Sequence, residues 1–161
     1  YALVKLEEAY DVRIVTQNVD DLHERAGSRQ VLHLHGELMK ARSSVDSSLI
    51  YSLGERNIEL GDTCDKGSQL RPHVVWFGEM VPAMIEAAEQ LVEASTLIVV
   101  GTSLAVYPAA GLVDSARRDA LKYVVNPDIP EAMKRADVTG IAKTACEGVP
   151  LLVKELLEMN G

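Results

Sequence analysis

The chain has 161 residues, of which 47% are hydrophobic, which is enough for one globular domain with a real core. Its net charge is -8 and it has no block of Lys or Arg, so we expect no nucleic-acid partner held through phosphates. It has no run of about 18 apolar residues that could cross a membrane, and two cysteines make no disulfide framework. We therefore expect a cytoplasmic protein without membrane attachment.

Short β-branched runs alternate with amphipathic helical segments along the chain. Residues 1–10 predict a helix, because Leu3, Leu6 and Tyr10 lie on one face, and we expect further residues to precede it. This alternation is typical of an α/β fold with a mainly parallel sheet. The expected strands cover 12–15, 31–34, 73–77, 97–100 and 123–125, and the expected later helices cover 83–93, 107–119 and the tail from Val149, with Pro150 in its first turn.

Residues 43–70 interrupt the alternation. This stretch is polar, rich in Ser, Gly and Asp, and too long for a simple connection. We interpret it as a small inserted lobe within a single unit that spans residues 1–161.

Polar residues follow each of the expected strands. In an open α/β sheet, ligands bind beyond the carboxyl ends of the strands, so these five groups are predicted to line one crevice. Each group alone has a plainer explanation, because the same residue types end strands and cap helices, and Asp20 or Asp21 could cap the helical segment around Glu24. The five groups are Thr16 to Asp20, His35-Gly36, Gly78-Glu79, Gly101-Thr102-Ser103 and Asn126-Pro127.

His35 is the best candidate for proton transfer. It follows a strand, and the next residue, Gly36, would permit close approach of a ligand to the backbone. Imidazole titrates near neutral pH and suits a general base. His33 is instead interpreted as a structural histidine bonded to backbone. The histidines lack the short spacing of a zinc site.

Several long motifs, in this order, resemble the sirtuin family. They are TQNVDDLH at 16–23, AG at 26–27, HLHG at 33–36, LRPHVVWFGE at 70–79, GTSL at 101–104 and VYPA at 106–109. The resemblance runs from about Tyr1 to the C-terminus, with a gap at the polar stretch. It implies a Rossmann-like parallel sheet with helices on both faces. It also implies NAD-dependent removal of acyl groups, acetyl or succinyl, from protein lysines, giving nicotinamide and O-acyl-ADP-ribose.

The resemblance also implies residue roles. His35 would be the catalytic base, with Asn18 and Asp20 orienting the nicotinamide. The NAD-binding residues would be Gln17, Asn18, Asp20, Gly101, Thr102, Ser103, Asn126, Ala145 and Cys146. The residues that line the acyl-lysine channel, where the substrate backbone would pair as an extra strand, would be Val75, Phe77, Gly78, Glu79 and Val106.

The sequence departs from the family in two respects. The glycine-rich Gly-Ala-Gly-x-Ser segment, which follows the first strand and supports the NAD phosphates, would precede Tyr1. We therefore expect this chain to lack the first strand and to be weak or inactive alone. Where the family often has two cysteine pairs for a structural zinc, this chain has Ser43-Ser44 and Cys64 alone, so we expect no structural zinc. Lys40 and Arg42, at the edge of this stretch, could contact an anionic group, but we expect them to be solvated surface charges.

Two other functions are compatible with the same residues. One is mono-ADP-ribosyl transfer from the same cofactor, and the other is a non-catalytic NAD or ADP-ribose binding module. The sequence does not reveal the acyl preference, the protein targets or the oligomeric state.

Overall fold

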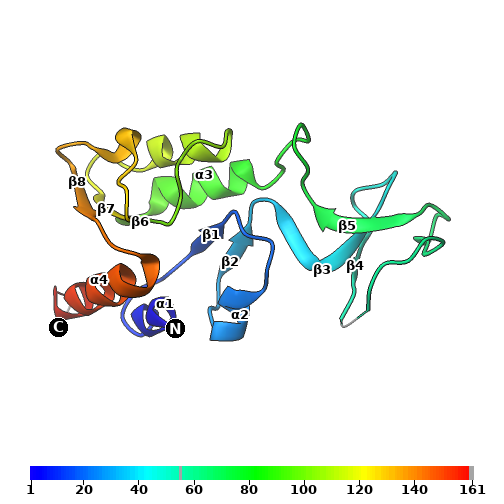
Figure 1. Cartoon of the computed structure of the whole chain (residues 1–161), viewed down its shortest axis with the longest axis horizontal. Helices are drawn as coiled ribbons and strands as arrows, with labels where there is room; N and C mark the ends of the chain where they lie inside the picture. Colours follow the sequence, from blue (N-terminus) through cyan, green and yellow to red (C-terminus); the bar gives the residue numbers. More distant parts are fainter. Residues whose placement is uncertain (55, 160–161) are drawn as a thin grey trace.

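The computed structural model describes residues 1–54 and 56–159, and it shows a layered body with a lobe at one end (Figure 1). The helices and strands alternate through most of the chain. In chain order they are α1 (Ala2–Leu6), β1 (Ile14–Thr16), α2 (Leu22–Ala26), β2 (Val31–His33), β3 (Gly36–Ser43), β4 (Ile50–Ser52), β5 (Leu70–Val74), α3 (Met84–Glu93), β6 (Thr96–Val100), the 3-10 helix η1 (Ala109–Ser115), β7 (Leu121–Val125), the 3-10 helix η2 (Glu131–Met133), β8 (Val138–Ile141) and α4 (Ala145–Met159).

The body contains two parallel sheets. Strand β1 pairs with β2, and Ile14 lies opposite Val31. Strand β7 lies between β6 and β8, parallel to both, with Ile98 opposite Tyr123. The β-branched runs form these strands because both faces of a parallel sheet are covered. The predicted α/β fold with a Rossmann-like parallel arrangement is therefore confirmed.

Helices cover both faces of the body (Figure 1). On one face, α1 and α4 contribute Leu6 and Leu152 to a core cluster with Tyr123 and Val125 of β7. On the other face, α3 contributes Leu91 to a second cluster that also contains residues of β2, β6 and η1. Neighbouring residues of β7 point to opposite faces, because side chains alternate along a strand.

Three of the expected helices differ in extent from the structure, and the first of them, expected at 1–10, forms only the short helix α1. The segment 107–119 forms only the 3-10 helix η1, in which Gly111 and the β-branched Val113 disfavour a longer α-helix. Helix α4 begins at Ala145, ahead of the expected start, so Pro150 lies inside it and not in its first turn. Thr144 starts this helix, since its carbonyl oxygen accepts hydrogen bonds from the N–H groups of Glu147 and Gly148.

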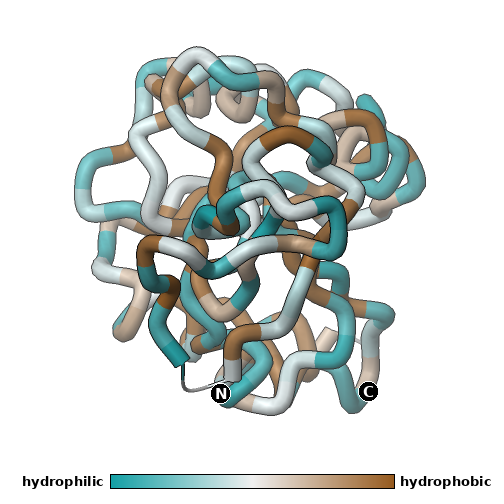
Figure 2. Tube along the Cα trace, turned by 90° about the vertical axis from the view of Figure 1, so that its right-hand side faces the viewer, coloured by the Kyte–Doolittle hydropathy of each residue, from teal (hydrophilic) through white to brown (hydrophobic). Residues whose placement is uncertain are grey.

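The lobe is a three-stranded antiparallel sheet in the order β4-β3-β5. The third expected strand, at 73–77, is wrong in both extent and direction. Strand β5 ends at Val74 and pairs antiparallel with β3, where Gly36 lies opposite Val74 and Ser43 opposite Leu70. The sheet therefore extends on both sides of residues 43–70. Seen from the lobe end, the trace mixes hydrophobic and hydrophilic segments (Figure 2).

Side chains join the two parallel sheets at both ends of their neighbouring strands. At the amino ends, Arg13 forms an ion pair with Glu93, with 2.9 Å between Nη1 and Oε2. At the carboxyl ends, Gln17 Nε2 lies 3.5 Å from Thr102 Oγ1. Strands β1 and β6 have no backbone ladder between them within the described ranges, 1–54 and 56–159.

Candidate active site

A chain of hydrogen bonds runs along the carboxyl ends of the strands. The N–H of Val75 donates to the His35 carbonyl at 2.9 Å, and His35 Nδ1 lies 3.1 Å from the Gln17 carbonyl oxygen. The Gln17 amide then reaches Thr102, whose carbonyl oxygen accepts a bond of 3.0 Å from Asn126 Nδ2. The structure thus joins residues from four of the five expected groups, and Val75 belongs to the segment that leads to the fifth, Gly78-Glu79.

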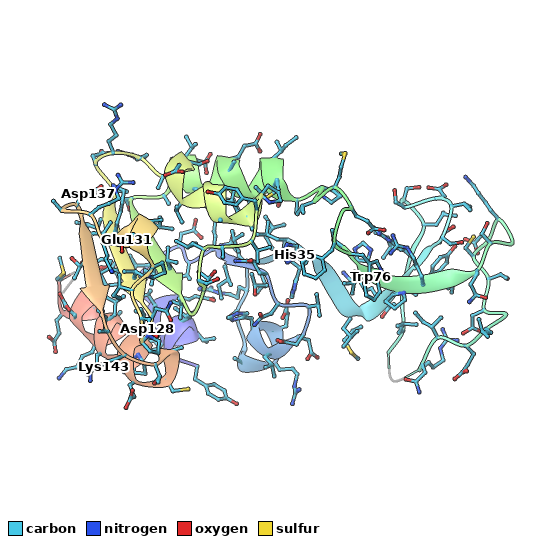
Figure 3. All side chains as sticks on the ribbon, turned by 45° about the horizontal axis from the view of Figure 1, so that its top comes forward. His35, Trp76, Asp128, Glu131, Asp137 and Lys143 are labelled. Carbon is cyan, nitrogen blue, oxygen red and sulfur yellow. The ribbon has the colours of Figure 1, made fainter. Side chains whose placement is uncertain are left out.

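His35 is held in one orientation at the junction of the body and the lobe (Figure 3). The Gln17 carbonyl oxygen can only accept a hydrogen bond, so Nδ1 of His35 must carry the hydrogen. In the neutral ring this leaves the lone pair on Nε2. The half-buried ring is therefore oriented to take a proton at Nε2.

His33 is built differently, although it lies only two residues away. Its Nδ1 lies 3.0 Å from the Asn18 carbonyl oxygen and its Nε2 lies 2.8 Å from Glu24 Oε1, so both nitrogens face acceptors. Burial alone would lower the pKa of His33, but the bonds to Glu24 and Asn18 outweigh it and raise this pKa. The expectation of a structural histidine bonded to backbone is confirmed.

Asn18 and Asp20 lie in the loop after β1. Hydrogen bonds fix both the N–H and the carbonyl group of Asn18. Its N–H donates to Thr16 Oγ1 at 3.1 Å, and its carbonyl oxygen faces Nδ1 of His33. Thr16 is buried, and sequence reasoning gave its hydroxyl no role of its own. The Asp20 carboxylate accepts a hydrogen bond of 3.2 Å from the Leu22 N–H at the start of α2. This bond agrees with the alternative explanation that Asp20 caps this helical segment.

Residues 101–103 form a tight loop after β6. Gly101 has a φ of +62°, which favours glycine, and its N–H donates to the Val125 carbonyl at 3.0 Å. Thr102 Oγ1 accepts from the Leu104 N–H at 3.1 Å in addition to its contact with Gln17. A side chain on Gly101 would point into open space, and Gly101 and Ser103 are exposed. The loop therefore offers polar groups to a ligand at this edge.

Ala145 and Cys146 lie in the first turn of α4, after β8. Both are exposed. They lie at the same edge as the other strand ends, because β8 is parallel to β7. No hydrogen bond given by the structure joins them to the chain that contains His35, so their part in a nucleotide site is a matter of position alone.

The predicted acyl-lysine residues lie around the turn after β5. Val75 is half-buried, whereas Phe77 is 98% exposed and Gly78 has a φ of +88°. Val106, from the loop before η1, is 45% exposed. The Glu79 side chain is directed to Arg42 and to a second arginine of the lobe, and is not free for a substrate. Of these residues, Val75 contacts His35 directly, because its N–H donates to the His35 carbonyl oxygen.

Arg42 is buried, in contrast to the expectation of a solvated charge. Only 8% of it is exposed. Its Nη2 lies 2.8 Å from Glu79 Oε2, which compensates the burial of the charge. Sequence reasoning missed this contact because the two residues are 37 positions apart.

Hydrogen bonds close the lobe around Ser43 and Cys64. The Ser43 hydroxyl accepts from the buried thiol of Cys64 at 3.4 Å. Asp46 forms an ion pair of 2.7 Å with Lys66, and this hydrogen bond is the main reason that the pKa of Asp46 falls to about 2. The described part of the chain holds no group of three or more His, Cys, Asp or Glu suited to a metal ion.

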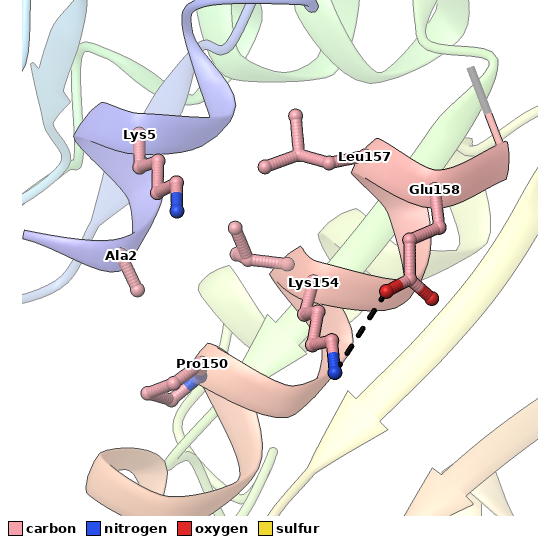
Figure 4. A pocket seen from close by; sticks show the side chains of 7 residues that line it. Ala2, Lys5, Pro150, Lys154, Leu157 and Glu158 are labelled. Carbon is pink, nitrogen blue, oxygen red and sulfur yellow. Dashed lines mark ion pairs between the residues drawn. The ribbon is translucent and has the colours of Figure 1, made fainter. Parts of the chain in front are cut away.

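An apolar groove lies between α1 and α4, away from the strand ends (Figure 4). Its volume is about 390 Å³, and Lys154 and Glu158 form an ion pair of 3.8 Å at its edge. None of its lining residues takes part in the hydrogen-bonded chain of His35. We therefore place the candidate active site at the strand ends. The groove is lined by Ala2, Lys5, Pro150, Val153, Lys154, Leu157 and Glu158.

Known proteins of one family are similar to this chain. The family model described as the Sir2 family matches residues 1–108. The chain belongs to the Sir2 family. It is 49% identical over 158 residues to a Helicobacter pylori NAD-dependent protein deacylase, covering 98% of this chain and 69% of that protein. It is 42% identical to the protein of the same name from Bacteroides thetaiotaomicron, covering 96% of this chain and 68% of the other.

Solved structures of the family share the fold. A complex of a Sir2 homologue with NAD superimposes with a TM-score of 0.85 at 38% identity, covering 99% of this chain and 64% of that one. Sir2 in complex with an inhibitor, 2'-O-acetyl-ADP-ribose and a deacetylated peptide gives a TM-score of 0.73 at 32% identity, covering 98% of this chain and 69% of that one. This chain thus spans about two thirds of the length of these relatives.

Proposed function

We propose that this protein removes acyl groups from protein lysines in an NAD-dependent reaction that gives nicotinamide and O-acyl-ADP-ribose. The observation that carries the proposal is the bond from His35 Nδ1 to the Gln17 carbonyl oxygen, which leaves Nε2 as an oriented proton acceptor. The relatives named NAD-dependent protein deacylases support it.

The strand ends suit a dinucleotide. Thr102 and Ser103 offer backbone amides and hydroxyls in an open loop that turns at Gly101, and Asn126 holds that loop through the Thr102 carbonyl. Ala145 and Cys146 lie farther along the same edge, where an adenine could rest. When bound, NAD supplies an electrophilic sugar carbon, to which the acyl oxygen can bond.

The side chains of this protein would perform the remaining work. His35 Nε2 takes the proton from a ribose hydroxyl, while the Gln17 carbonyl keeps the ring in place. Asn18 presents its amide from a fixed backbone and, with Asp20, can orient the carboxamide of nicotinamide. The apolar side chains after β5 would keep water from the reacting atoms.

The direct test is an incubation with NAD and an acetyl-lysine peptide, with products identified by mass spectrometry. We expect this chain alone to form free lysine peptide and O-acetyl-ADP-ribose only slowly, and we expect both products to be lost in His35→Ala but not in the control His23→Ala. A succinyl-lysine peptide in a parallel reaction compares the two acyl groups.

Other outcomes would replace the proposal. A peptide that gains the mass of ADP-ribose would indicate ADP-ribosyl transfer. Calorimetric binding of ADP-ribose without any turnover, unchanged by His35→Ala, would indicate a non-catalytic binding module.

We also propose a cytoplasmic location, because Cys64 and Cys146 are both free thiols, as in proteins of a reducing compartment. Among the residues that the structure describes, no helix is both long and apolar enough for a membrane span. Fractionation of cells that express the protein would test the location.

A further inference from the structure

One carboxylate ties the turn after β5 to the lobe. Glu79 Oε1 accepts from Arg71 Nη2 at 2.6 Å, and its Oε2 accepts from Arg42 Nη2 at 2.8 Å. The same Oε2 also accepts a hydrogen bond of 3.1 Å from the backbone N–H of Trp76. Donors from β3, β5 and the turn itself therefore converge on a single side chain.

The two arginines also hold the end of β5. Arg42 Nη2 and Arg71 Nη1 each lie 3.4 Å from the Val74 carbonyl oxygen. The next residue, Val75, donates its N–H to the carbonyl oxygen of His35. The turn that begins here is therefore fixed to the candidate base on one side and to the arginines on the other.

Glu79 is ionised in this setting. The hydrogen bond from the Trp76 N–H, and then the bonds and charges of Arg71 and Arg42, lower the pKa of Glu79. Glu37, which lies on the same strand as Arg42, is paired with Lys40 at 2.7 Å. Within residues 1–54 and 56–159, both arginines have Glu79 as their ion-pair partner.

The polar groups of the turn bond to the arginines of the lobe, whereas its large apolar side chains are exposed. Trp76 is 55% exposed and Phe77 is 98% exposed. An acylated lysine has an uncharged amide on an aliphatic stem, which suits such side chains, whereas a free lysine carries a strongly hydrated charge. The shape of the turn thus decides where this apolar surface lies relative to His35.

We propose that Glu79 is a positioning residue, whose carboxylate shapes the turn that presents Trp76 and Phe77 to the acyl-lysine without itself contacting the substrate. The inference rests on the proposed function for the identity of the substrate. The prediction that Glu79 lines the acyl-lysine channel is refined, because its carboxylate is bound to Arg42 and Arg71.

Trp76 is the single tryptophan of the chain, so its fluorescence reports the turn without any need for turnover. The variants are Glu79→Gln, Arg71→Gln and the double variant, with Glu131→Gln as control. Glu131 pairs with Lys134 at 2.8 Å and lies far from Trp76 (Figure 3). Circular dichroism establishes whether each variant folds. If Glu79→Gln does not fold, Arg71→Gln alone provides the test.

We expect the amplitude of the fast Trp76 anisotropy decay to increase about twofold in Glu79→Gln and in Arg71→Gln. In the double variant this amplitude should not exceed that of the more affected single variant, because both changes remove the same interaction. The control should match the wild type. Unchanged Trp76 motion in folded Glu79→Gln would overturn the proposal, as would additive effects in the double variant.

Kinetics test the link to the substrate. In Glu79→Gln we expect KM for the acyl-lysine peptide to rise about tenfold, with kcat and KM for NAD nearly unchanged, because the turn contributes to binding and not to proton transfer. A fall in kcat alone would contradict the positioning role. A wild-type protein without turnover would overturn the proposed function, while the Trp76 measurement would still decide whether Glu79 shapes the turn.

Discussion

Nδ1 of His35 lies 3.1 Å from the carbonyl oxygen of Gln17, so the backbone of one strand end fixes the ring that follows the neighbouring strand. Strands β1 and β2 are parallel and in register, with Thr16 opposite His33, which brings the residues just beyond them side by side. The orientation of the candidate base is thus a consequence of the parallel pairing, not of the loop alone.

This relationship predicts the tautomer of His35. The neutral ring should carry its hydrogen on Nδ1, and long-range proton–nitrogen NMR correlations of the imidazole nitrogens measure this directly. His33 gives an internal comparison, because both of its ring nitrogens face acceptors. Its ring should stay doubly protonated to a higher pH than an ordinary histidine, since its pKa is raised. A hydrogen on Nε2 of neutral His35 would contradict the assignment of the base.

Gly36 is predicted to be indispensable to the packing of the lobe against His35. It has a φ of +83°, and a Cβ there would collide with the carbonyl group of His73 on β5. Gly36→Ala should reduce the free energy of unfolding by about 3 kcal/mol, from backbone strain together with the clash. Urea denaturation measures the change.

Gly61 provides the matched control. Its φ is +102°, but a Cβ would meet nothing within 4 Å, so Gly61→Ala should show the backbone strain alone, about 1 kcal/mol. Equal losses in the two variants would mean that the close approach of β5 is not what requires Gly36.

The sequence was informative about the strand ends. Runs such as Leu97 to Val100 followed by Gly101-Thr102-Ser103 predict both a buried strand and a polar end, because parallel strands are apolar on both faces. Parallel pairing then places such ends at one edge, and the contact between Gln17 and Thr102 lies there. The convergence could therefore be predicted before any distance was known.

The lobe was harder to predict. The apolar run from His73 to Phe77 has no feature that distinguishes a parallel from an antiparallel partner, and its pairing with β3 depends on Gly36. The ion pair between Glu79 and Arg42 could not be predicted either, because an ion pair between distant positions leaves no local sequence pattern. Gly36 itself was interpreted as room for a ligand, whereas it makes room for the backbone of β5.

Ser43 is predicted to stabilise the lobe in place of a metal. Its buried hydroxyl accepts bonds from the N–H groups of Val45 and Asp46, at 3.3 and 3.1 Å, as well as from Cys64. Ser43→Ala should cost about 1–2 kcal/mol, because these donors lose their acceptor. Thermal unfolding should show the loss, and the exposed neighbour Ser44→Ala should not.

The same arrangement predicts that chelators leave the protein unaffected. Incubation with a zinc chelator should not shift the melting temperature, and elemental analysis should find far less than one zinc per chain. A chelator-dependent melting temperature would show that a metal contributes to stability after all.

The pair of His33 and Glu24 predicts a pH dependence of stability. Because the pKa of His33 is raised in the folded state, protonated His33 adds to the free energy of unfolding. This contribution is complete below about pH 6.5, the usual pKa in the unfolded state, and is lost as pH rises through the higher pKa of the folded state. The hydrogen bond from His33 outweighs the effect of burial and lowers the pKa of Glu24. The contribution of Glu24 is present above about pH 4.3 and is lost as pH falls through the lower folded value. Both groups therefore stabilise the fold together between about pH 4.3 and 6.5.

His33→Gln tests this window. The His33 side chain is 6% exposed but that of Glu24 is 42% exposed, so we expect the variant to lose only about 1 kcal/mol at about pH 6. At about pH 9 the difference from the wild type should shrink, because His33 is then neutral in both folded and unfolded states. Urea denaturation at the two pH values gives the comparison, and His23→Gln, which leaves the pair intact, is the control. A difference that stays constant or grows with pH would show that the neutral ring, and not the ion pair, stabilises this end of β2.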